Sequence, residues 1–192
     1  MKRESGSVLL ISLVMLLILT LVGVASISGV SMTEKMTNSQ RDYDIAFELA
    51  EAALVQGERW LDDYDPSWKH DHIDANCTGN LCWTQDCSTG LCFRGSYPST
   101  ANALCEVDSS GTPIWQVEAN WENKALTYSE SVPAVDQPKY MIEFLCYTPR
   151  DPANFTEPPD YTSWVRVYRV TALAYGTHPE TRVMLQSTYR VE

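Results

Sequence analysis

The chain has 192 residues and a net charge of −11, with 14 Lys and Arg residues against 25 Asp and Glu residues. This length suits one domain with an appendage. Binding a phosphate backbone needs clustered basic side chains that release counterions, and no three basic residues are adjacent in this sequence. The acidic balance therefore argues against nucleic acid as a partner.

An uncharged, strongly apolar segment, VLLISLVMLLILTLVGVASISGV, occupies positions 8–30. At about 1.5 Å per residue, a helix of this length spans roughly 34 Å, enough to cross a hydrocarbon core of ~30 Å. Lys2 and Arg3 precede the segment, and basic residues favour the cytoplasmic side of a membrane helix. We therefore expect the N-terminus in the cytoplasm and the rest of the chain outside it.

Three interpretations of residues 1–30 compete. A cleaved secretory signal has an apolar core of about 7–15 residues, shorter than this one, although residues 24–26 could serve as its cleavage site. A plain single-pass anchor is the second interpretation. The third is a prepilin-type signal, in which a short hydrophilic leader ends in Gly and the apolar segment is kept. The leader MKRESG fits that form, and cleavage after Gly6 would leave Ser7 at the head of an apolar helix.

The helical pattern continues past the apolar segment, since the first proline is Pro66. Apolar residues recur at spacings of three, four and seven, with charges between them. They are Met32, Met36, Tyr43, Phe47, Ala50, Leu54 and Leu61. A strip of small side chains, Ala46, Ala50 and Ala53, is suited to close contact with another helix. A continuous helix over 7–61 would be roughly 80 Å long, more than a small domain can bury, so we expect it to bundle with similar helices.

The run GSVLLISLVMLLILTLVGVAS, then EKM, Asn38 and RDYDIAFELAEAAL, resembles the N-terminal region of PilX-type minor pilins of the type IV pilus. The resemblance covers residues 6–58. Its most specific part, AF-x-x-AE-x-AL, consists of Ala46, Phe47, Ala50, Glu51, Ala53 and Leu54. It implies a helix that packs into the filament through Ala46, Phe47, Ala50, Ala53 and Leu54.

No catalytic constellation is visible in the sequence, so we expect a protein that is not an enzyme and needs no cofactor. The resemblance has further implications. It implies processing by a prepilin peptidase and residence in the bacterial inner membrane, with the C-terminal domain in the periplasm. It further implies incorporation into the pilus beside major and other minor pilins, near the tip. There the protein would help to start assembly and to present a PilY-type tip adhesin.

Two positions depart from the usual pilin pattern. Ile11 stands at the fifth position after Gly6, where pilins usually carry a Glu that is thought to pair with the N-terminal amine of a neighbouring subunit. An acidic group within the bilayer is costly unless it is paired. The K-type pseudopilin at the tip of type II secretion systems also lacks this Glu, so we expect a tip position. The alternative is that the site tolerates an aliphatic residue anywhere in the filament. Ser7 replaces the usual Phe, which leaves methylation open.

Six cysteines follow the apolar segment: Cys77, Cys82, Cys87, Cys92, Cys105 and Cys146. Outside the cytoplasm, disulfide bonds are expected. The first four lie in a short repeat, CTGNLCW followed by CSTGLCF. A zinc site is the alternative, but this spacing is at the edge of the range for zinc knuckles and an oxidising compartment opposes it. We favour the pairs Cys77–Cys82, Cys87–Cys92 and Cys105–Cys146. A crossed pattern among the first four cysteines stays open, because sequence cannot choose the connectivity.

The remaining chain predicts an α+β fold. Residues 62–113 contain five of the six cysteines and little periodicity, which indicates a cystine-rich loop lobe. Strand patterns at 114–121, 140–147, 164–175 and 182–191 predict an antiparallel sheet within 114–192. The turn-like link at 176–180 predicts a hairpin, and the four prolines of 148–162 indicate an exposed loop. The N-terminal helix, transmembrane over 7–30 and amphipathic over 31–61, would pack on this sheet.

Sites for chemistry are sparse. The run His70-Asp71-His72 lies near several Asp residues, but its spacing matches neither a zinc helix motif nor a calcium loop. A solvated acidic loop is the favoured interpretation, and we expect no metal. No nucleophile elbow or phosphate loop is present in the sequence. Trp68 and Trp83 are candidates for a partner surface. They support the alternative function, a membrane-anchored binding or adhesion module whose cystine-rich lobe binds a partner or metal.

Overall fold

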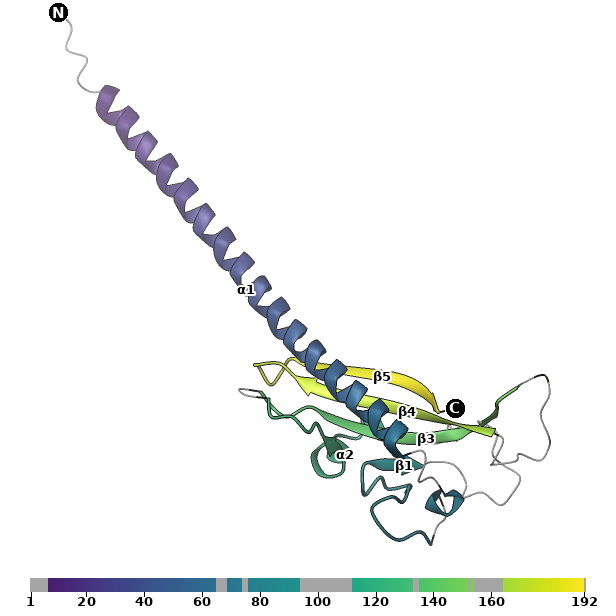
Figure 1. Cartoon of the computed structure of the whole chain (residues 1–192). Helices are drawn as coiled ribbons and strands as arrows, with labels where there is room; N and C mark the ends of the chain where they lie inside the picture. Colours follow the sequence, from purple (N-terminus) through teal and green to yellow (C-terminus); the bar gives the residue numbers. More distant parts are fainter. Residues whose placement is uncertain are drawn as a thin grey trace, which may run out of the picture. The chain divides into compact units, whose positions relative to one another are not determined.

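The computed structural model describes residues 7–64, 69–73, 76–93, 112–132, 135–151, 153 and 164–191. Helix α1, Ser7–Tyr64, is the predicted long helix and extends three residues beyond its expected end (Figure 1). The chain divides into two compact units, Met1–Asp42 and Tyr43–Glu192. The first unit contains the N-terminal part of α1. The second contains the remainder of α1 and every strand of the described chain.

The second unit is built on a mixed sheet whose strands follow the order β1-β3-β4-β5, with β2 also pairing with β3. Its strands are β1 (Leu91–Phe93), β2 (Leu126–Thr127), β3 (Lys139–Pro149), β4 (Trp164–Tyr175) and β5 (Arg182–Val191). Strands β3, β4 and β5 form the predicted antiparallel meander. Figure 1 shows the C-terminal part of α1 crossing this meander. The α+β class is therefore confirmed.

The purely antiparallel sheet expected from sequence is wrong in one respect, because β1 pairs with β3 in parallel. This short strand comes from the lobe that was expected to consist of loops. Its alternation divides its side chains between the two faces of the sheet. Leu91 and Phe93 join the core beneath α1, whereas Cys92 joins a smaller core on the other face.

The strand predicted at 114–121 is also wrong. The structure has a 3-10 helix, η3 (Ile114–Gln116), followed by the short helix α2 (Glu118–Asn123). Ile114 begins η3 and Trp121 lies in α2, and both are buried. Side chains of this segment donate hydrogen bonds to its backbone carbonyls. Asn120 Nδ2 donates to the Ile114 carbonyl and Trp121 Nε1 donates to the Trp115 carbonyl, each at 2.8 Å. Short apolar runs fit either period, and here the helical one holds.

The sheet has an apolar face beneath α1 and a more polar opposite face. On the α1 side, Tyr140, Ile142, Phe144, Tyr168, Val170 and Ala172 pack with Ala53, Leu61 and Tyr64 of α1. The opposite face carries the smaller core of Cys87, Cys92, Ile114, Trp121, Met141 and Leu173. We call this second surface the outer face. It follows from strand alternation, because neighbouring residues of β3 and β4 point to opposite sides.

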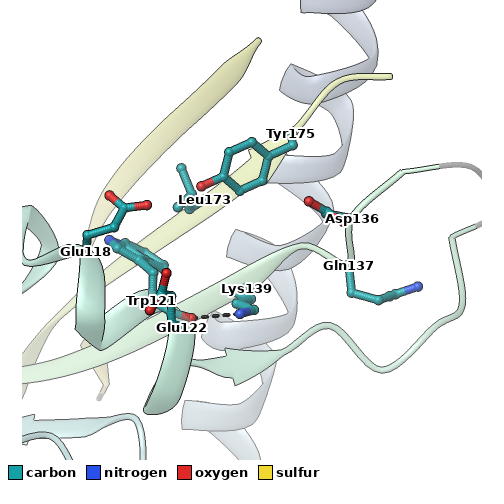
Figure 2. Close-up of a pocket in the computed structure, with 8 residues that line it drawn as sticks. All are labelled: Glu118, Trp121, Glu122, Asp136, Gln137, Lys139, Leu173 and Tyr175. Atoms are coloured by element: carbon teal, nitrogen blue, oxygen red, sulfur yellow. Dashed lines mark hydrogen bonds between the residues drawn. The ribbon is translucent and has the colours of Figure 1, made fainter. Parts of the chain in front are cut away.

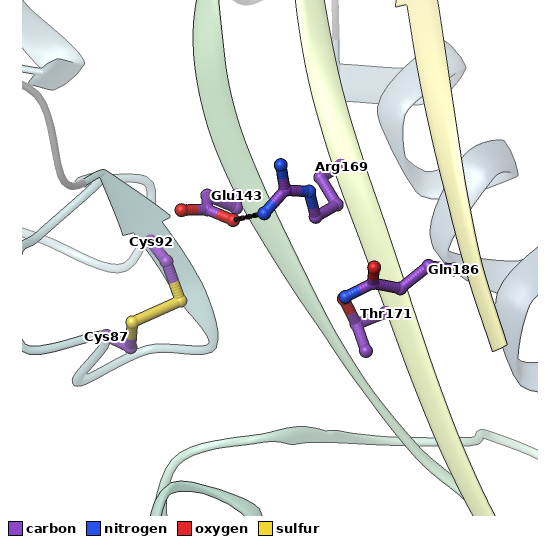
Figure 3. Close-up of polar contacts among 6 residues, drawn as sticks. All are labelled: Cys87, Cys92, Glu143, Arg169, Thr171 and Gln186. Atoms are coloured by element: carbon purple, nitrogen blue, oxygen red, sulfur yellow. Dashed lines mark hydrogen bonds and ion pairs between the residues drawn. A yellow bond between two sulfur atoms is a disulfide. The ribbon is translucent and has the colours of Figure 1, made fainter. Parts of the chain in front are cut away.

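Beyond its small core, the outer face carries polar cross-strand pairs (Figure 3). Glu143, which is buried, accepts a hydrogen bond of 3.3 Å from Arg169, its register partner on β4. Gln186 Nε2 donates to Thr171 Oγ1 at 2.9 Å, and these residues are register partners of β4 and β5. Direct cross-strand pairs of this kind favour one register of the strands over its alternatives.

Candidate functional site

The N-terminal part of α1 displays its apolar side chains. Large apolar residues between Val8 and Val24 are 45 to 70 % exposed, and Ile11 is 59 % exposed. Within the described residues, α1 is the one helix long and apolar enough to cross a membrane by length and composition. Such a surface suits lipid or the apolar side chains of other helices. Ser7 is the first residue of α1, and Gly6 lies outside the described residues.

The small-residue strip of α1 has a different partner from the one that sequence suggested. Ala46, Ala50 and Ala53 are fully buried within the chain's own second unit. Ala46 and Ala50 pack with Ala174 and Val183 of the β4–β5 hairpin. The expectation that this strip contacts a sister helix is therefore wrong. Small side chains let a helix approach a sheet closely as well as another helix, and here the strip faces the sheet.

Sequence reasoning missed Gly57, which continues the same strip. A Cβ atom at this position would lie 2.6 Å from Val170 Cγ1 and 3.1 Å from Tyr140 Cδ2. Such separations are below van der Waals contact, so the absence of a side chain at Gly57 allows α1 to sit this close to β3 and β4. The signal was available, because positions 46, 50, 53 and 57 follow the helical spacing of four, three and four.

Phe47 and Leu54, the larger residues of the proposed helix-packing motif, are only partly buried. Phe47 packs against the cluster of Ala46, Ala50, Ala174 and Val183. Its ring stacks on Tyr43, with ring centroids 6.4 Å apart. Leu54 packs against the main core. These side chains flank the buried strip and keep part of their surface free.

Two disulfide bonds hold the described part of the lobe, Cys77–Cys82 and Cys87–Cys92. These are two of the pairs favoured from sequence, and the crossed alternative is absent. Cys146 is also disulfide-bonded. Its predicted partner, Cys105, lies outside the described residues, so that pairing stays a prediction. Cys87 has a φ of 57° and Gly90 a φ of 77°, left-handed conformations that tighten the second loop.

The two units of the cysteine repeat lie side by side. Thr84, which follows the first unit, forms a parallel bridge with Cys92 of the second. Its backbone N–H donates to the Leu91 carbonyl at 3.2 Å, and the Phe93 N–H donates to the Thr84 carbonyl at 3.0 Å. Each unit ends in an aromatic residue, Trp83 or Phe93, that enters the main core. The repeat is therefore a pair of cystine loops anchored by equivalent aromatic side chains.

The expectation that Trp83 contributes to a partner surface is wrong, because its side chain is fully buried. Its ring centroid lies 5.3 Å from that of Tyr168 and 6.3 Å from that of Phe144. Its Nε1 donates a hydrogen bond of 3.2 Å to the Tyr64 hydroxyl. Indole is large and apolar with a single donor, so a core position with one acceptor suits it. Trp68, the other candidate, lies outside the described residues.

The histidine loop contacts the end of α1. The Tyr64 hydroxyl and His72 Nδ1 share a short hydrogen bond. Burial lowers the pKa of His72, and the nearby Lys69 charge lowers it further, whereas Asp71 acts in the opposite direction. A neutral imidazole can accept a hydrogen bond from the Tyr64 hydroxyl at Nδ1. Among the described residues, no group of three or more His, Cys, Asp or Glu side chains is arranged to hold a metal ion.

Comparison with known families extends across the helix, the lobe and the sheet. The PilX N-terminal model matches residues 5–55, and the model of the type IV pilus assembly protein PilX C-terminal region matches residues 68–191. No curated protein and no solved structure gives a significant match. The second family model alone spans more than half of the chain, including the cystine loops and the sheet that no sequence motif had identified. The chain therefore belongs to the PilX family and is a minor pilin of the type IV pilus.

Proposed function

We propose that a prepilin peptidase cleaves this minor pilin after Gly6 and that residues 7–30 then hold it in the inner membrane. The second unit, from Tyr43 onward, would lie in the periplasm until the protein enters the pilus beside major and other minor pilins. One contrast in α1 carries the proposal. The chain's own sheet covers the small-residue strip of Ala46, Ala50, Ala53 and Gly57, whereas the apolar side chains between Val8 and Val24 are exposed.

This contrast supports a separate role for each segment of the chain. Residues 1–6 would be the leader, 7–30 the membrane helix and 31–61 the amphipathic part of α1 that supports the head. Residues 62–113 would be the cystine lobe and 114–192 the sheet region. The lobe supplies β1 to the sheet, so the lobe and the sheet region would enter the filament as one head.

A tip position is the finer part of the proposal. Ile11 stands where a Glu would otherwise pair with a neighbour's N-terminal amine, and the Ile11 side chain is exposed and apolar. A subunit without this carboxylate loses a paired charge inside the filament, where an ion pair is strong because the surroundings are apolar. We infer that the subunit lies at or near the tip, where it starts assembly and presents a PilY-type adhesin.

The mature N-terminus tests the processing step. Intact mass spectrometry of the protein purified from cells should give a chain that begins at Ser7. A Gly6→Val variant should keep its leader, because the cleavage site prefers the small residue. A chain that begins at Met1, or one cut near Ile27, would contradict the proposal, since either result indicates a plain anchor or a secretory signal.

The variant Ile11→Glu tests the position in the filament. Epitope-tagged wild-type protein should label pilus ends, whereas Ile11→Glu should spread label along the shaft. Ile11→Val is the matched control, because it changes the side chain without adding a carboxylate. Identical label distributions for all three proteins would show that Ile11 does not determine position.

The alternative function, a binding or adhesion module, rested on two candidate surface residues. One of them, Trp83, is buried in the core. The cystine loops are tied to the sheet through β1 and Thr84. A lobe integrated into the head in this way favours the assembly role over an independent binding module.

A further inference from the structure

A groove lies on the outer face, at the end of the sheet where β3 begins and β4 ends (Figure 2). One cavity of about 360 Å³ is lined by side chains from α2, from the segment before β3, and from β4. A second cavity of about 330 Å³ shares Glu118, Trp121 and Leu173 with the first. Because the two cavities share these lining residues, they lie next to each other. We call the two together the α2 groove.

Carboxylates dominate the first part of the α2 groove. Glu118 and Glu122 lie four residues apart on α2, and Asp136 approaches from the segment before β3. Glu122 and Asp136 are exposed side chains of the rim. Glu118 is paired with Arg182 at 3.6 Å, so the charges that a bound cation would balance are those of Glu122 and Asp136.

Both basic residues of the groove are engaged within the chain. Lys139 Nζ donates a hydrogen bond of 2.8 Å to the Trp121 carbonyl (Figure 2). Arg182 lies 3.6 Å from Glu118, and both of these side chains are largely exposed. Lys139 keeps its positive charge in this bond because its acceptor is a neutral carbonyl, so three carboxylates and two cations give the groove a net charge of −1.

The second part of the groove adds apolar surface, although Gln116, Glu118 and Arg182 also line it. Met184 is 39 % exposed and lines this cavity together with Trp115, while the buried Leu173 forms part of the floor of both cavities. Methionine is flexible and polarisable, so it adapts to side chains of different shape. The acidic and apolar parts therefore lie next to each other in one groove.

We propose that the α2 groove binds an extended, positively charged segment of a partner protein. A Lys or Arg side chain of that segment would lie against Glu122 and Asp136, and a neighbouring apolar side chain against Met184 and Trp115. Charge complementarity selects the partner, because an acidic groove repels acidic segments and attracts basic ones.

Other occupants fit the groove less well. Among the described residues, no group of carboxylates, histidines or cysteines is arranged to hold a metal ion. Trp121 is only 3 % exposed, so its own ring is closed to stacking by a sugar. An extended peptide combines an apolar side chain with a cation at short spacing, which is the combination that the two cavities present.

Peptide binding to the full-length protein in detergent micelles tests this proposal. The probes are a fluorescein-labelled hexapeptide of alternating Arg and Leu and its counterpart of alternating Glu and Leu. The groove variant is Glu122→Gln with Asp136→Asn. The matched control is Glu48→Gln with Asp63→Asn, which removes the same charge from exposed positions of α1. Fluorescence anisotropy gives the affinity of each pair.

The wild-type protein should bind the Arg peptide and not the Glu peptide. The groove variant should weaken binding about tenfold or more, while the control stays close to wild type. Met184→Lys should also weaken binding, because it places a cation in the apolar part. Equal losses in groove and control variants would attribute binding to net charge alone and overturn the proposal. So would equal affinity for both peptides, or no affinity for the Arg peptide.

The measurement needs no assembled pilus. A negative result would therefore not affect the proposals on cleavage after Gly6 and on the position in the filament. If either of those proposals fails, peptide binding still tests the groove.

Discussion

Gly57 of α1 lies against Val170 of β4 so closely that a Cβ atom on Gly57 would stand 2.6 Å from Val170 Cγ1. This contact sets how near the helix approaches the sheet, because Val170 is fully buried and branched at Cβ. The second unit thus depends on a position with no side chain near the C-terminal end of α1.

Gly57→Ala should destabilise the head. The substitution favours the helix by about 1 kcal/mol, but forcing a methyl group into a packed core costs roughly 1–3 kcal/mol. At a separation of 2.6 Å we expect the packing cost to exceed the helix gain. Thermal unfolding followed by near-ultraviolet circular dichroism should give a lower midpoint than wild type. Gly23→Ala is the control, since a Cβ there meets nothing within 4 Å. A midpoint for Gly57→Ala at or above that of wild type would refute the packing argument.

Tyr189 links the last strand to α1, because its hydroxyl donates a hydrogen bond of 2.8 Å to Asp62 Oδ1. This bond, together with burial, raises the pKa of Tyr189 from 10.0 to about 12. The folded protein therefore holds this proton more tightly than the unfolded chain does. The resulting stabilisation is complete below pH 10 and is lost as the pH rises through about 12.

Burial also raises the pKa of Tyr128 and Tyr140, so ultraviolet titration of the phenolates should show several late tyrosines, to which Tyr189 contributes a component near pH 12. This component should be missing in Tyr189→Phe. In Asp62→Asn it should move back toward the ordinary tyrosine range, because the carboxylate that opposes ionisation is gone. An unchanged amplitude of the late titration in Tyr189→Phe would show that Tyr189 does not contribute to it.

His72 makes the head sensitive to acid. Burial lowers the pKa of His72 below 6.5, so the unfolded chain takes up this proton at a higher pH than the folded protein. The stabilisation is therefore complete above pH 6.5 and is lost as the pH falls through the lowered folded-state value. Denaturant unfolding at several pH values should show this loss in wild type and a flatter profile in His72→Gln. His178→Gln, on the exposed β4–β5 link, should retain the wild-type profile. Parallel profiles for wild type and His72→Gln would exclude His72 as the source.

The two cystine loops should differ in their contribution to stability. Both close the same sequence separation of 5, so the chain-entropy model assigns each about 2 kcal/mol. Cys87 and Cys92 are fully buried in the outer-face core, whereas Cys77 is only partly buried. We expect Cys87→Ala with Cys92→Ala to lower the free energy of unfolding more than Cys77→Ala with Cys82→Ala. Equal losses for both double variants, measured by denaturant unfolding, would mean that packing around the second bridge adds nothing.

Much of the candidate site could be found from the sequence, but its partners could not. The positions of the small-residue strip were clear from helical spacing, yet the strip was assigned to a sister helix and packs on the chain's own sheet. Trp83 stood out as a large aromatic residue in a loop-rich region, yet it lies in the core beside Tyr168. In both cases the residue type was informative, and the surface that covers it came from a segment far away in the chain.

The sequence by itself determined α1 and the two strands β4 and β5, whose periodic patterns are long and whose ends are marked by turn residues. It also singled out the repeat that contains four cysteines, whereas the structure decided that they pair within each unit of the repeat. Only the tertiary structure decided that β1 joins β3 in parallel, that residues 118–123 turn into a helix, and that Gly57 faces Val170. Periodicity is a local property that reveals which side of an element is apolar. The identity of the opposing surface depends on contacts between residues distant in sequence, and those are set by how the whole chain packs.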